Sequence, residues 1–326
     1  MGYRRGAALD TLKQRAAMLR AVRAFFAARG VLEVETPALS PAGVTDPAIE
    51  SIVAGVRSLG PAPHYLHTSP EFPMKRLLAA GSGDIYQLCR VFRDAELGRW
   101  HQPEFTLLEW YRVGFDELEL MSEVAELIAV ALAAAAPRAP PAPRSVRLTY
   151  ADALEGALGA RPEAPTHELV RRLESRGVEV PPNLSHDAVL DLAFGTVVGA
   201  SFDAAAVTFV HDYPASQAAL ARLKPGTPPV AARFEAFMGG LELANGFHEL
   251  GDAAEQRRRF ARDVEARRAD GRAAPPVDED FLDALPALPD CAGVALGFDR
   301  LVALATGQDG VAAAVSFAHG GDAAKE

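Results

Sequence analysis

Three segments of the chain combine charged side chains with glycines and apolar runs. They are residues 92–105, 240–249 and 293–300. Arg93 follows an apolar run that predicts a buried strand, and Arg300 lies between an apolar turn and an apolar helix. Because burying a guanidinium is costly unless it meets an anion, both arginines indicate an anion-binding site.

Two carboxylates, Glu242 and Glu249, lie seven residues apart on either side of Asn245. On a bent strand both side chains could face one pocket. Two carboxylates facing two arginines would form a site for phosphate and a divalent metal. The spacing alone leaves a second interpretation open, in which Arg93 and Arg300 only form structural ion pairs with neighbouring acids.

Several common catalytic motifs do not occur in the sequence. It has no G-x-x-x-x-G-K-[ST] phosphate loop and no G-x-S-x-G elbow, and residues 81–83 lack the third glycine of a dinucleotide fingerprint. The two cysteines, Cys89 and Cys291, are far apart, which excludes a cysteine-rich zinc site and fits a reducing cytoplasm. Nucleotide chemistry would therefore need a different architecture.

The elements that position these residues follow from hydrophobic periodicity. We expect helices at 12–26, at 70–79 and from 252 onward, strands at 31–35, 84–92, 105–112, 207–213 and 233–243, and a turn followed by a helix at 294–305. Strands and short helices without regular βαβ alternation favour an α+β fold around an antiparallel sheet.

The chain has 326 residues and a formal net charge of −10, with 49% hydrophobic residues. This composition excludes a disordered chain, and no apolar stretch is long enough to predict a membrane span or a secretory signal. The net negative charge argues against binding of nucleic acid over the whole protein surface. Residues 137–145 are rich in proline and predict a linker, and about 146–205 predicts a mainly helical insertion.

The charged segments resemble the motifs of class II aminoacyl-tRNA synthetases. The N-terminal helix, the strand after it and Pro37 resemble motif 1, residues 92–105 resemble motif 2, and residues 297–301 resemble motif 3. The amino-acid sequences of segments 68–71, 101–106 and 242–250 are most similar to those of the lysyl branch. Within that branch, 104–112 and 213–217 are most similar to the ligases that attach lysine to elongation factor P. The resemblance covers residues 12 to about 317.

The resemblance implies one class II synthetase-like catalytic domain over 1–326, an antiparallel sheet flanked by helices, with no anticodon-binding domain. It implies ATP-dependent activation of lysine, with (R)-β-lysine as the expected isomer, as an adenylate. The acyl group would then pass to the ε-amino group of a lysine on elongation factor P, forming an amide. AMP and diphosphate are the other products.

The resemblance also implies the roles of individual residues. Arg93 and Arg300 are the expected catalytic residues, and Mg²⁺ is expected on Glu242 and Glu249. The residues expected to bind ATP are Arg93, Asp94, Glu96, Gln102, Glu242, Leu243, Gly297 and Arg300. The residues expected to bind the amino acid are Ser69, Pro70, Glu71, Tyr111, Asn245, Glu249 and Ala295.

Three positions depart from the family pattern. Ala95 occupies the place of the motif 2 glutamate, which leaves open whether Glu96 replaces it. Gln102 stands where the lysyl branch usually has asparagine. Ala295 stands where lysyl-tRNA synthetases have glycine, and its methyl group could reshape the pocket for β-lysine over α-lysine.

The expected partners are elongation factor P, lysine or β-lysine, and a second copy of the chain bound through the motif 1 region. We expect neither a membrane nor tRNA as partner, since 326 residues leave no room for an RNA-reading domain. Two alternatives remain open at this point. One is a minimal lysyl-tRNA synthetase-like enzyme acting on tRNA, and the other is a non-catalytic paralogue that binds nucleotide as a regulator.

Overall fold

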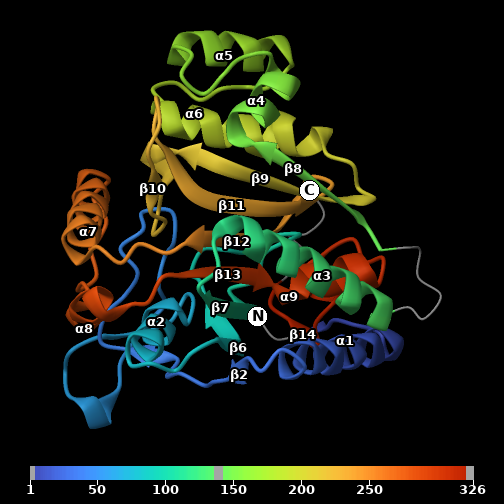
Figure 1. Ribbon diagram of the computed structural model, residues 1–326, viewed down its shortest axis with the longest axis vertical. Coiled ribbons are helices and arrows are strands. Elements are labelled where there is room, and N and C mark those ends of the chain that lie inside the picture. The colour runs from blue at the N-terminus through green and yellow to red at the C-terminus, as the bar shows by residue number, and fades with distance from the viewer. Residues whose placement is uncertain (1–3, 136–141, 321–326) are drawn as a thin grey trace.

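A large mixed sheet forms the centre of the computed structural model, which describes residues 4–135 and 142–320 (Figure 1). Its strand order is β2-β6-β7-β13-β12-β11-β9-β8, and β10 pairs with β11. The strands are β2 (Leu32–Glu33), β6 (Ile85–Phe92), β7 (Glu104–Val113), β8 (Arg144–Thr149), β9 (Ala206–Pro214), β10 (Leu223–Lys224), β11 (Val230–Met238), β12 (Leu241–His248) and β13 (Cys291–Gly297). The pairs from β6 to β9 are antiparallel, and only the two outer pairs along this path, β2 with β6 and β8 with β9, are parallel.

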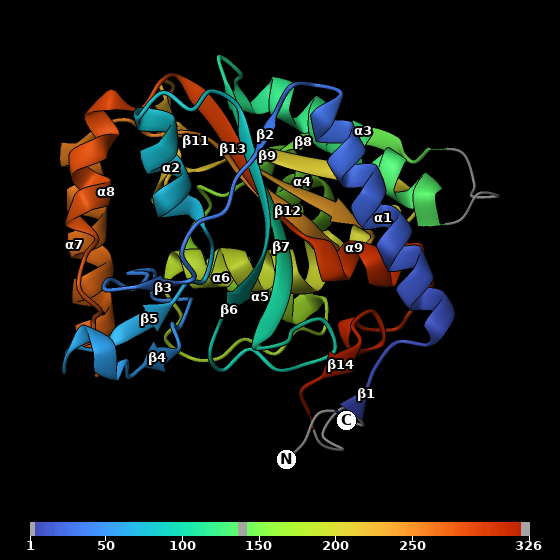
Figure 2. The same cartoon turned by 90° about the horizontal axis from the view of Figure 1, so that it is seen from below.

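Helices cover the two faces of the sheet differently, as Figures 1 and 2 show. Three helices pack on one face over the main hydrophobic core: α1 (Leu9–Ala27), α3 (Glu117–Ala135) and α9 (Phe298–Ala305). On the other face, α4 (Tyr150–Leu158), α5 (Thr166–Ser175) and α6 (His186–Ala193) build a second core against β9 and β11. The helices α2 (Glu71–Ala79), α7 (Ala253–Ala269) and α8 (Glu279–Ala284) pack together beyond the other end of that face.

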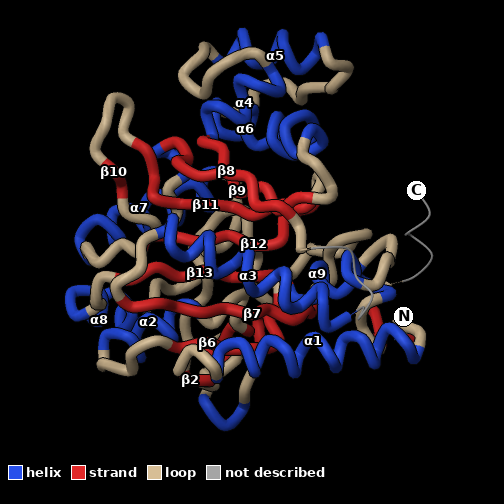
Figure 3. The backbone as a smooth tube through the Cα atoms, turned by 45° about the vertical axis from the view of Figure 1, so that its right-hand side comes forward, coloured by secondary structure: helices blue, strands red, loops and turns tan. Residues whose placement is uncertain are grey.

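Small elements complete the fold. The strands β3 (Leu39–Ser40), β4 (Val53–Ala54) and β5 (His64–Leu66) form a three-stranded sheet, and β1 (Arg4–Arg5) pairs with β14 (Phe317–Ala318) near the two ends of the described chain. The tube in Figure 3 shows α5 and α6 above the stacked strands, with α1 and α3 running across them. Within 4–135 and 142–320, no helix has the length and apolarity needed to cross a membrane.

The α+β fold with a mainly antiparallel sheet is confirmed, and so are most of the expected elements around the polar segments. Ser69 stabilises the start of α2 as expected, because its Oγ accepts a hydrogen bond from the Glu71 N–H at 3.0 Å. Asp252 caps α7 in the same way, accepting from the N–H groups of Ala254 and Glu255. The expected strand at 233–243 is a hairpin, since Gly239 and Gly240 separate β11 from β12.

Three sequence expectations differ from the structure. The apolar run at 294–297 is part of strand β13 and not a turn, because it pairs with β7 on one side and β12 on the other. A short apolar run does not reveal by periodicity alone that it is a buried strand. The expected helical insertion at about 146–205 begins with four residues of strand β8. Of the expected linker 137–145, residues 137–141 lie outside the described residues and Arg144 already belongs to β8.

Helix α7 carries a run of arginines, two of which anchor the helix to the rest of the protein. Arg267 is 1% exposed, and its guanidinium donates to the carbonyl of Thr45 at 2.9 Å and pairs with Glu50 at 2.9 Å. Arg259 is 8% exposed and donates to the carbonyls of Ala219 and Ala221. These two buried guanidinium groups hold loops in place and do not face solvent.

Candidate active site

Four neighbouring strands align polar side chains on the face of the sheet opposite α1 and α3. The strand register defines two rows across β7, β13, β12 and β11. The first row is Glu109, Ala295, Asn245 and Glu235, and the second is Tyr111, Gly293, Phe247 and Arg233. Because side chains alternate along a strand, residues two apart share a face, so both rows lie on one side of the sheet.

A β-bulge brings Glu242 to this same face. Ala236 pairs with Ala244, but the next residue, Phe237, pairs with Glu242, so Leu243 is an extra residue in β12. Without the bulge, alternation from Asn245 would turn Glu242 toward the core. The extra residue reverses this: Leu243 is 1% exposed within the hydrophobic core, and Glu242 lines a cavity together with Glu235.

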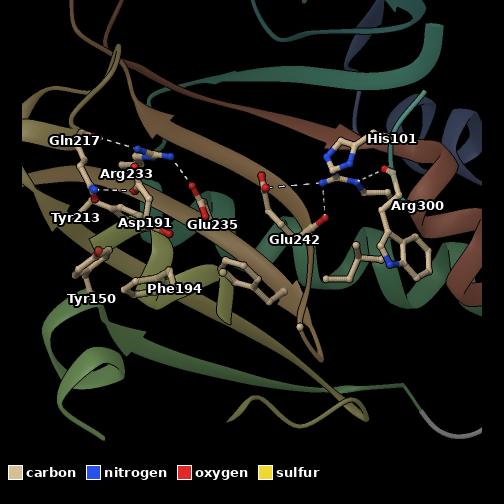
Figure 4. A pocket seen from close by; sticks show the side chains of 15 residues that line it. His101, Tyr150, Asp191, Phe194, Tyr213, Gln217, Arg233, Glu235, Glu242 and Arg300 are labelled. Atoms are coloured by element: carbon tan, nitrogen blue, oxygen red, sulfur yellow. Dashed lines mark hydrogen bonds and ion pairs between the residues drawn. The ribbon is translucent and has the colours of Figure 1, made fainter. Parts of the chain in front are cut away.

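Arg300 lies at one end of this cavity and is held by three neighbours (Figure 4). Its Nη1 donates to the Glu242 carbonyl at 2.9 Å and lies 3.7 Å from the Glu242 carboxylate. Its Nε donates to the Trp100 carbonyl at 3.2 Å, and its Nη2 lies 2.7 Å from His101 Nε2. Burial and the positive charges of Arg300 and Arg93 lower the pKa of His101, so His101 is neutral here and can accept this hydrogen bond.

Arg93 follows directly after β6 and is only partly paired. Its Nε lies 3.4 Å from the Thr68 carbonyl, its Nη1 lies 3.7 Å from the Glu96 carboxylate, and its guanidinium lies over the Phe105 ring at 5.1 Å. The side chain is 25% exposed. Arg93 and Arg300 both contact the loop between β6 and β7: Arg93 pairs with Glu96, and Arg300 bonds to Trp100 and His101. In this corner of the site Arg93 makes only long contacts, whereas each of the three guanidinium nitrogens of Arg300 has a hydrogen-bond partner.

A second group of charges lies buried beside this corner, between α2 and the sheet. Lys75 Nζ lies 2.6 Å from a carboxylate oxygen of Glu71 and 2.6 Å from one of Glu249. Glu109 accepts hydrogen bonds from the Tyr111 hydroxyl at 2.7 Å and the Ser69 hydroxyl at 2.8 Å. Lys75, Glu109, Tyr111 and Glu249 are each 1–2% exposed. We call the five residues Glu71, Lys75, Glu109, Tyr111 and Glu249 the acidic pocket.

The acidic pocket holds more carboxylates than cations, which shifts their protonation. Burial and the nearby charge of Glu71 raise the pKa of Glu109 to about 8. Burial raises the pKa of Glu249 to about 7, although Lys75 counteracts the shift. The two carboxylates outweigh the effect of burial on Lys75 and raise its pKa, so its ammonium group stays charged. The pocket is therefore prepared to accept further positive charge.

The acidic pocket requires a glycine at position 293. A Cβ atom at Gly293 would lie 2.2 Å from the Tyr111 ring and 2.5 Å from a carboxylate oxygen of Glu249. Only a residue without a side chain fits there. Gly297 differs, because a Cβ at that position would meet Arg300 at an ordinary 3.5 Å.

The structure does not bring Glu242 and Glu249 together, as the expected shared metal ion would require. They stand at opposite ends of β12, and a rise of roughly 3.3 Å per residue separates their backbones by about 20 Å. Glu249 is paired with Lys75, whereas Glu242 faces the cavity together with Glu235. Burial and the charge of Glu242 raise the pKa of Glu235, while Arg233 opposes the shift. The structure thus pairs Glu242 with Glu235.

Several other expected residues lie at or near these two regions. Asn245 accepts from Arg233 at 3.2 Å, and Ala295 lies between Asn245 and Glu109 in the first row. Gln102 is 5% exposed, and its side-chain oxygen accepts from the His319 N–H at 2.8 Å. Asp94 Oδ1 accepts from the N–H of Ala95 at 2.8 Å. Gln102 and Asp94 therefore hold backbone groups in this structure.

Two further expected residues have side chains that do not offer a polar group to the site. Pro70 precedes α2 as its N-cap residue and carries no polar side chain. Leu243 is expected to bind ATP, but the bulge places its side chain in the core, so only its backbone can face the site.

Sequence reasoning missed four charged residues of the site: Lys75, Glu109, Arg233 and Glu235. A signal existed for two of them. Glu109 interrupts an apolar strand, and Glu235 stands seven residues before Glu242, the same spacing that drew attention to Glu249. A charged residue inside a buried strand must find a partner or a ligand. For Lys75 the sequence offers no signal, since it looks like an ordinary helix residue.

The comparisons with known proteins agree with this geometry. Residues 1–320 match the family described as tRNA synthetases class II (D, K and N). An elongation factor P–(R)-β-lysine ligase from Vibrio cholerae is 46% identical over 319 residues, which are 95% of this chain and 96% of that protein. Proteins of the same name from Pseudoalteromonas translucida and Salmonella gallinarum are 46% and 44% identical, each over 95% of this chain. The chain therefore belongs to the class II (D, K and N) tRNA synthetase family.

Proposed function

We propose that this protein activates (R)-β-lysine with ATP and transfers it to a lysine ε-amino group of elongation factor P. The relatives that match over 95% of the chain are named for that reaction. The observation in the structure that best supports the proposal is the charge of the acidic pocket. Glu71, Glu109 and Glu249 contribute three negative charges when ionised, and Lys75 contributes one positive charge.

The remaining charge of the acidic pocket is 3 − 1 = 2 negative units, which matches a substrate with two ammonium groups. Lysine and β-lysine carry two ammonium groups and one carboxylate. A buried pocket with two uncompensated carboxylates favours a dication over a monocation, because unpaired buried charges are costly. The substrate carboxylate lies outside this count and is free to point to the arginines.

Activation requires the carboxylate oxygen of the substrate to attack the α-phosphorus of ATP. The new C–O–P linkage forms while the bond from that phosphorus to the bridging oxygen breaks, and diphosphate leaves with the electron pair. We propose that Arg93 contacts the α-phosphate and Arg300 the γ-phosphate end. Arg93 has only long contacts to Thr68 and Glu96, and Arg300 would exchange its bonds to Trp100, Glu242 or His101 for phosphate oxygens. Positioning and neutralisation of charge account for the acceleration.

Glu235 and Glu242 are the residues that would hold Mg²⁺ with ATP. Carboxylate oxygens suit this ion, and both residues line the same cavity. Bound Mg²⁺ neutralises phosphate charge. Glu96, which pairs with Arg93, is the acidic side chain that we propose takes the role that Ala95 cannot fill.

In the second step the ε-amine of the acceptor lysine attacks the carbonyl carbon of the adenylate. The C–N bond forms, the bond from carbon to the phosphate oxygen breaks, and AMP leaves with that electron pair. The amine gives up its protons to water or buffer. No ester on RNA is needed for an amide product, so we propose that tRNA is not the acceptor.

Two assays test the proposal. Exchange of labelled diphosphate into ATP should depend on (R)-β-lysine, which a non-catalytic paralogue would not support. The adenylated enzyme is then offered tRNA and unmodified elongation factor P together. Label on elongation factor P supports the proposal, whereas label on tRNA with unmodified protein contradicts it and favours the synthetase alternative.

We further propose that the protein works in the cytoplasm as a homodimer formed through α1 and β2. Cys89 and Cys291 are free thiols, which suits a reducing compartment. Leu32 on the edge strand β2 is 55% exposed and Leu9 on α1 is 59% exposed, so this region presents apolar surface. Light scattering at micromolar concentration would show a mass of two chains. A monomer with full activity would contradict the dimer.

A further inference from the structure

The cavity that contains Arg300 and Glu242 continues past Glu235 toward α6 and the end of β9. Its volume is about 360 Å³. Figure 4 shows Arg300, His101 and Glu242 at one end and a group of aromatic and polar side chains at the other. We call this second end the aromatic arm; its residues are Tyr150, Asp191, Phe194, Tyr213 and Gln217. None of the roles proposed above uses these five residues.

The aromatic arm contains a carboxylate without a cationic partner. Asp191 accepts a hydrogen bond from the uncharged Gln217 amide at 2.9 Å, and no ion pair joins it to a cation among the described residues. Arg233, the nearest guanidinium that lines the cavity, is bound instead to Glu235, to Asn245 and to the Gln217 carbonyl. Burial raises the pKa of Asp191, against the effect of Arg233. One negative charge is therefore left to be balanced.

Aromatic rings line the same end of the cavity as this carboxylate. Tyr150 stacks on Phe194 with ring centroids 4.1 Å apart and meets Tyr213 edge-on at 4.9 Å. Tyr150 is 1% exposed, and its hydroxyl has no hydrogen-bond partner in the described part of the chain. A buried polar atom without a partner that lines a cavity indicates a missing ligand group. Aromatic faces next to a single carboxylate suit an alkylammonium group.

The aromatic arm is open to the outside at one end. Asp191 and Gly195 are exposed residues of the cavity wall, whereas Tyr150 and Tyr213 at its base are buried. A side chain presented by another protein can thus enter past Asp191 and reach toward Glu242 and Arg300. A long, unbranched, cationic side chain fits this path better than a phosphate, because Asp191 would repel an anion at the entrance.

We propose that the aromatic arm is the entrance for the acceptor lysine: its ammonium group first binds Asp191 at the mouth, its alkyl stem then packs on Phe194, and Tyr150 and Tyr213 line the path inward. The inference rests on the proposed transfer to a protein lysine. It adds the place where that lysine is recognised before its neutral amine attacks the adenylate. The segment 213–217, whose sequence resembles that of ligases acting on elongation factor P, supplies two walls of this entrance, Tyr213 and Gln217.

The test compares Asp191→Asn with Asp187→Asn, in the full-length protein. Asp187 lies one turn earlier on α6, accepts a hydrogen bond from Ser216 at 2.8 Å and does not line the cavity. With Asp191→Asn we expect unchanged diphosphate exchange. The kcat/KM for elongation factor P should fall about 10- to 100-fold, since a hydrogen bond to a charged group is lost. Asp187→Asn should leave both reactions unchanged.

A binding measurement isolates the charge of the acceptor. Wild-type enzyme should bind elongation factor P more tightly than a form whose acceptor lysine is replaced by methionine, and Asp191→Asn should remove this difference. Hydroxylamine should consume the preformed adenylate equally fast in both proteins. If Asp191→Asn transfers the amino acid to elongation factor P as fast as the wild type, the inference is overturned. It is also overturned if Asp191→Asn loses diphosphate exchange to the same extent as it loses transfer. If the wild type itself transfers nothing to elongation factor P, the proposed function fails instead.

Discussion

The Nζ atom of Lys75 lies 2.6 Å from Oε2 of Glu249, and both residues are almost completely buried. The same ammonium group lies 2.6 Å from Glu71, one turn away on α2. One helix residue thus joins α2 to the end of β12 and holds two carboxylates that would otherwise repel each other. The acidic pocket is organised around a cation that belongs to the protein.

Removing the Lys75 ammonium group should lower the stability of the folded protein. For Lys75→Met we expect a loss of about 3–5 kcal/mol in the free energy of unfolding, because two buried carboxylates lose their partner. Urea unfolding at neutral pH measures it. Arg76→Gln is the matched control: its partner Asp280 is 74% exposed, so this variant should lose no more than about 1 kcal/mol. Similar losses in both variants would contradict the role given to Lys75.

Binding of the diamine substrate should release protons. The folded protein raises the pKa of Glu109 to about 8 and that of Glu249 to about 7, so both carboxyls are partly protonated at pH 7. An arriving ammonium favours the ionised forms, and affinity should therefore increase as pH rises from about 6 to 8. Calorimetry in buffers of different ionisation enthalpy counts the protons. Glu109→Gln should reduce that count, and a count independent of this substitution would exclude Glu109 as the source.

The same raised pKa values make the free protein less stable as pH rises. An acid whose pKa is higher in the folded state than its unfolded value near 4.5 binds more protons when folded. Its contribution to stability is therefore lost between pH 4.5 and about 8. Saturating lysine should flatten this slope in thermal unfolding, since the bound ammonium groups replace the protons.

Glu235 and Glu242 should both be needed for Mg²⁺. Replacing either residue with glutamine should raise the Mg²⁺ concentration required for diphosphate exchange by about 10- to 100-fold. Glu104→Gln serves as the control, because Glu104 lies on β7 beside Arg90 and away from the cavity. A normal Mg²⁺ requirement in Glu235→Gln, with a raised one in Glu249→Gln, would restore the pairing that the sequence suggested.

Two glycines of β13 should respond differently to alanine. Gly293→Ala places a methyl group against Tyr111 and Glu249, so we expect a loss of about 1–3 kcal/mol in the free energy of unfolding and weak substrate binding. Gly297→Ala meets the flexible Arg300 side chain and the Leu243 carbonyl only at ordinary contact distances and should fold normally. Its defect should appear as a raised KM for ATP. Equal thermal stability of the two variants would contradict this distinction.

Ala295 should influence the choice between isomers of lysine. It lies between Asn245 and Glu109 in one row of the sheet, so its methyl group borders the space where the substrate backbone would lie. In Ala295→Gly we expect the ratio of kcat/KM for (R)-β-lysine to that for L-α-lysine to fall. Diphosphate exchange with each isomer measures it. An unchanged ratio would show that the methyl group does not select the isomer.

The sequence was informative where chemistry is local. Asp252 caps α7, Ser69 accepts a hydrogen bond from the first residue of α2, and the apolar runs around Arg93 form the hairpin of β6 and β7. The motif resemblance also identified two arginines that contact the loop between β6 and β7. Such features depend on residues that are close together in the sequence, so the sequence pattern can predict them.

The partners of Glu242 could not be predicted, because they depend on a single extra residue in a strand. The bulge at Leu243 reverses which side chains of β12 face the site, and nothing in the spacing reveals it. Lys75 and Glu249 are 174 positions apart in sequence, and their contact exists only once α2 packs against the sheet. Long-range pairing and register therefore decided the parts of the site that the sequence left open.

Strands β9 and β11 belong to both hydrophobic cores at once. Phe209 and Phe234 point into the core under α1 and α3, while Val210 and Ala231 point into the core under α4 to α6. Neither core can melt without exposing the opposite side of the same two strands, so we expect the helical insertion and the remainder of the protein to denature cooperatively. In calorimetry this would give one heat-absorption peak, and the insertion would not behave as an independent folding unit.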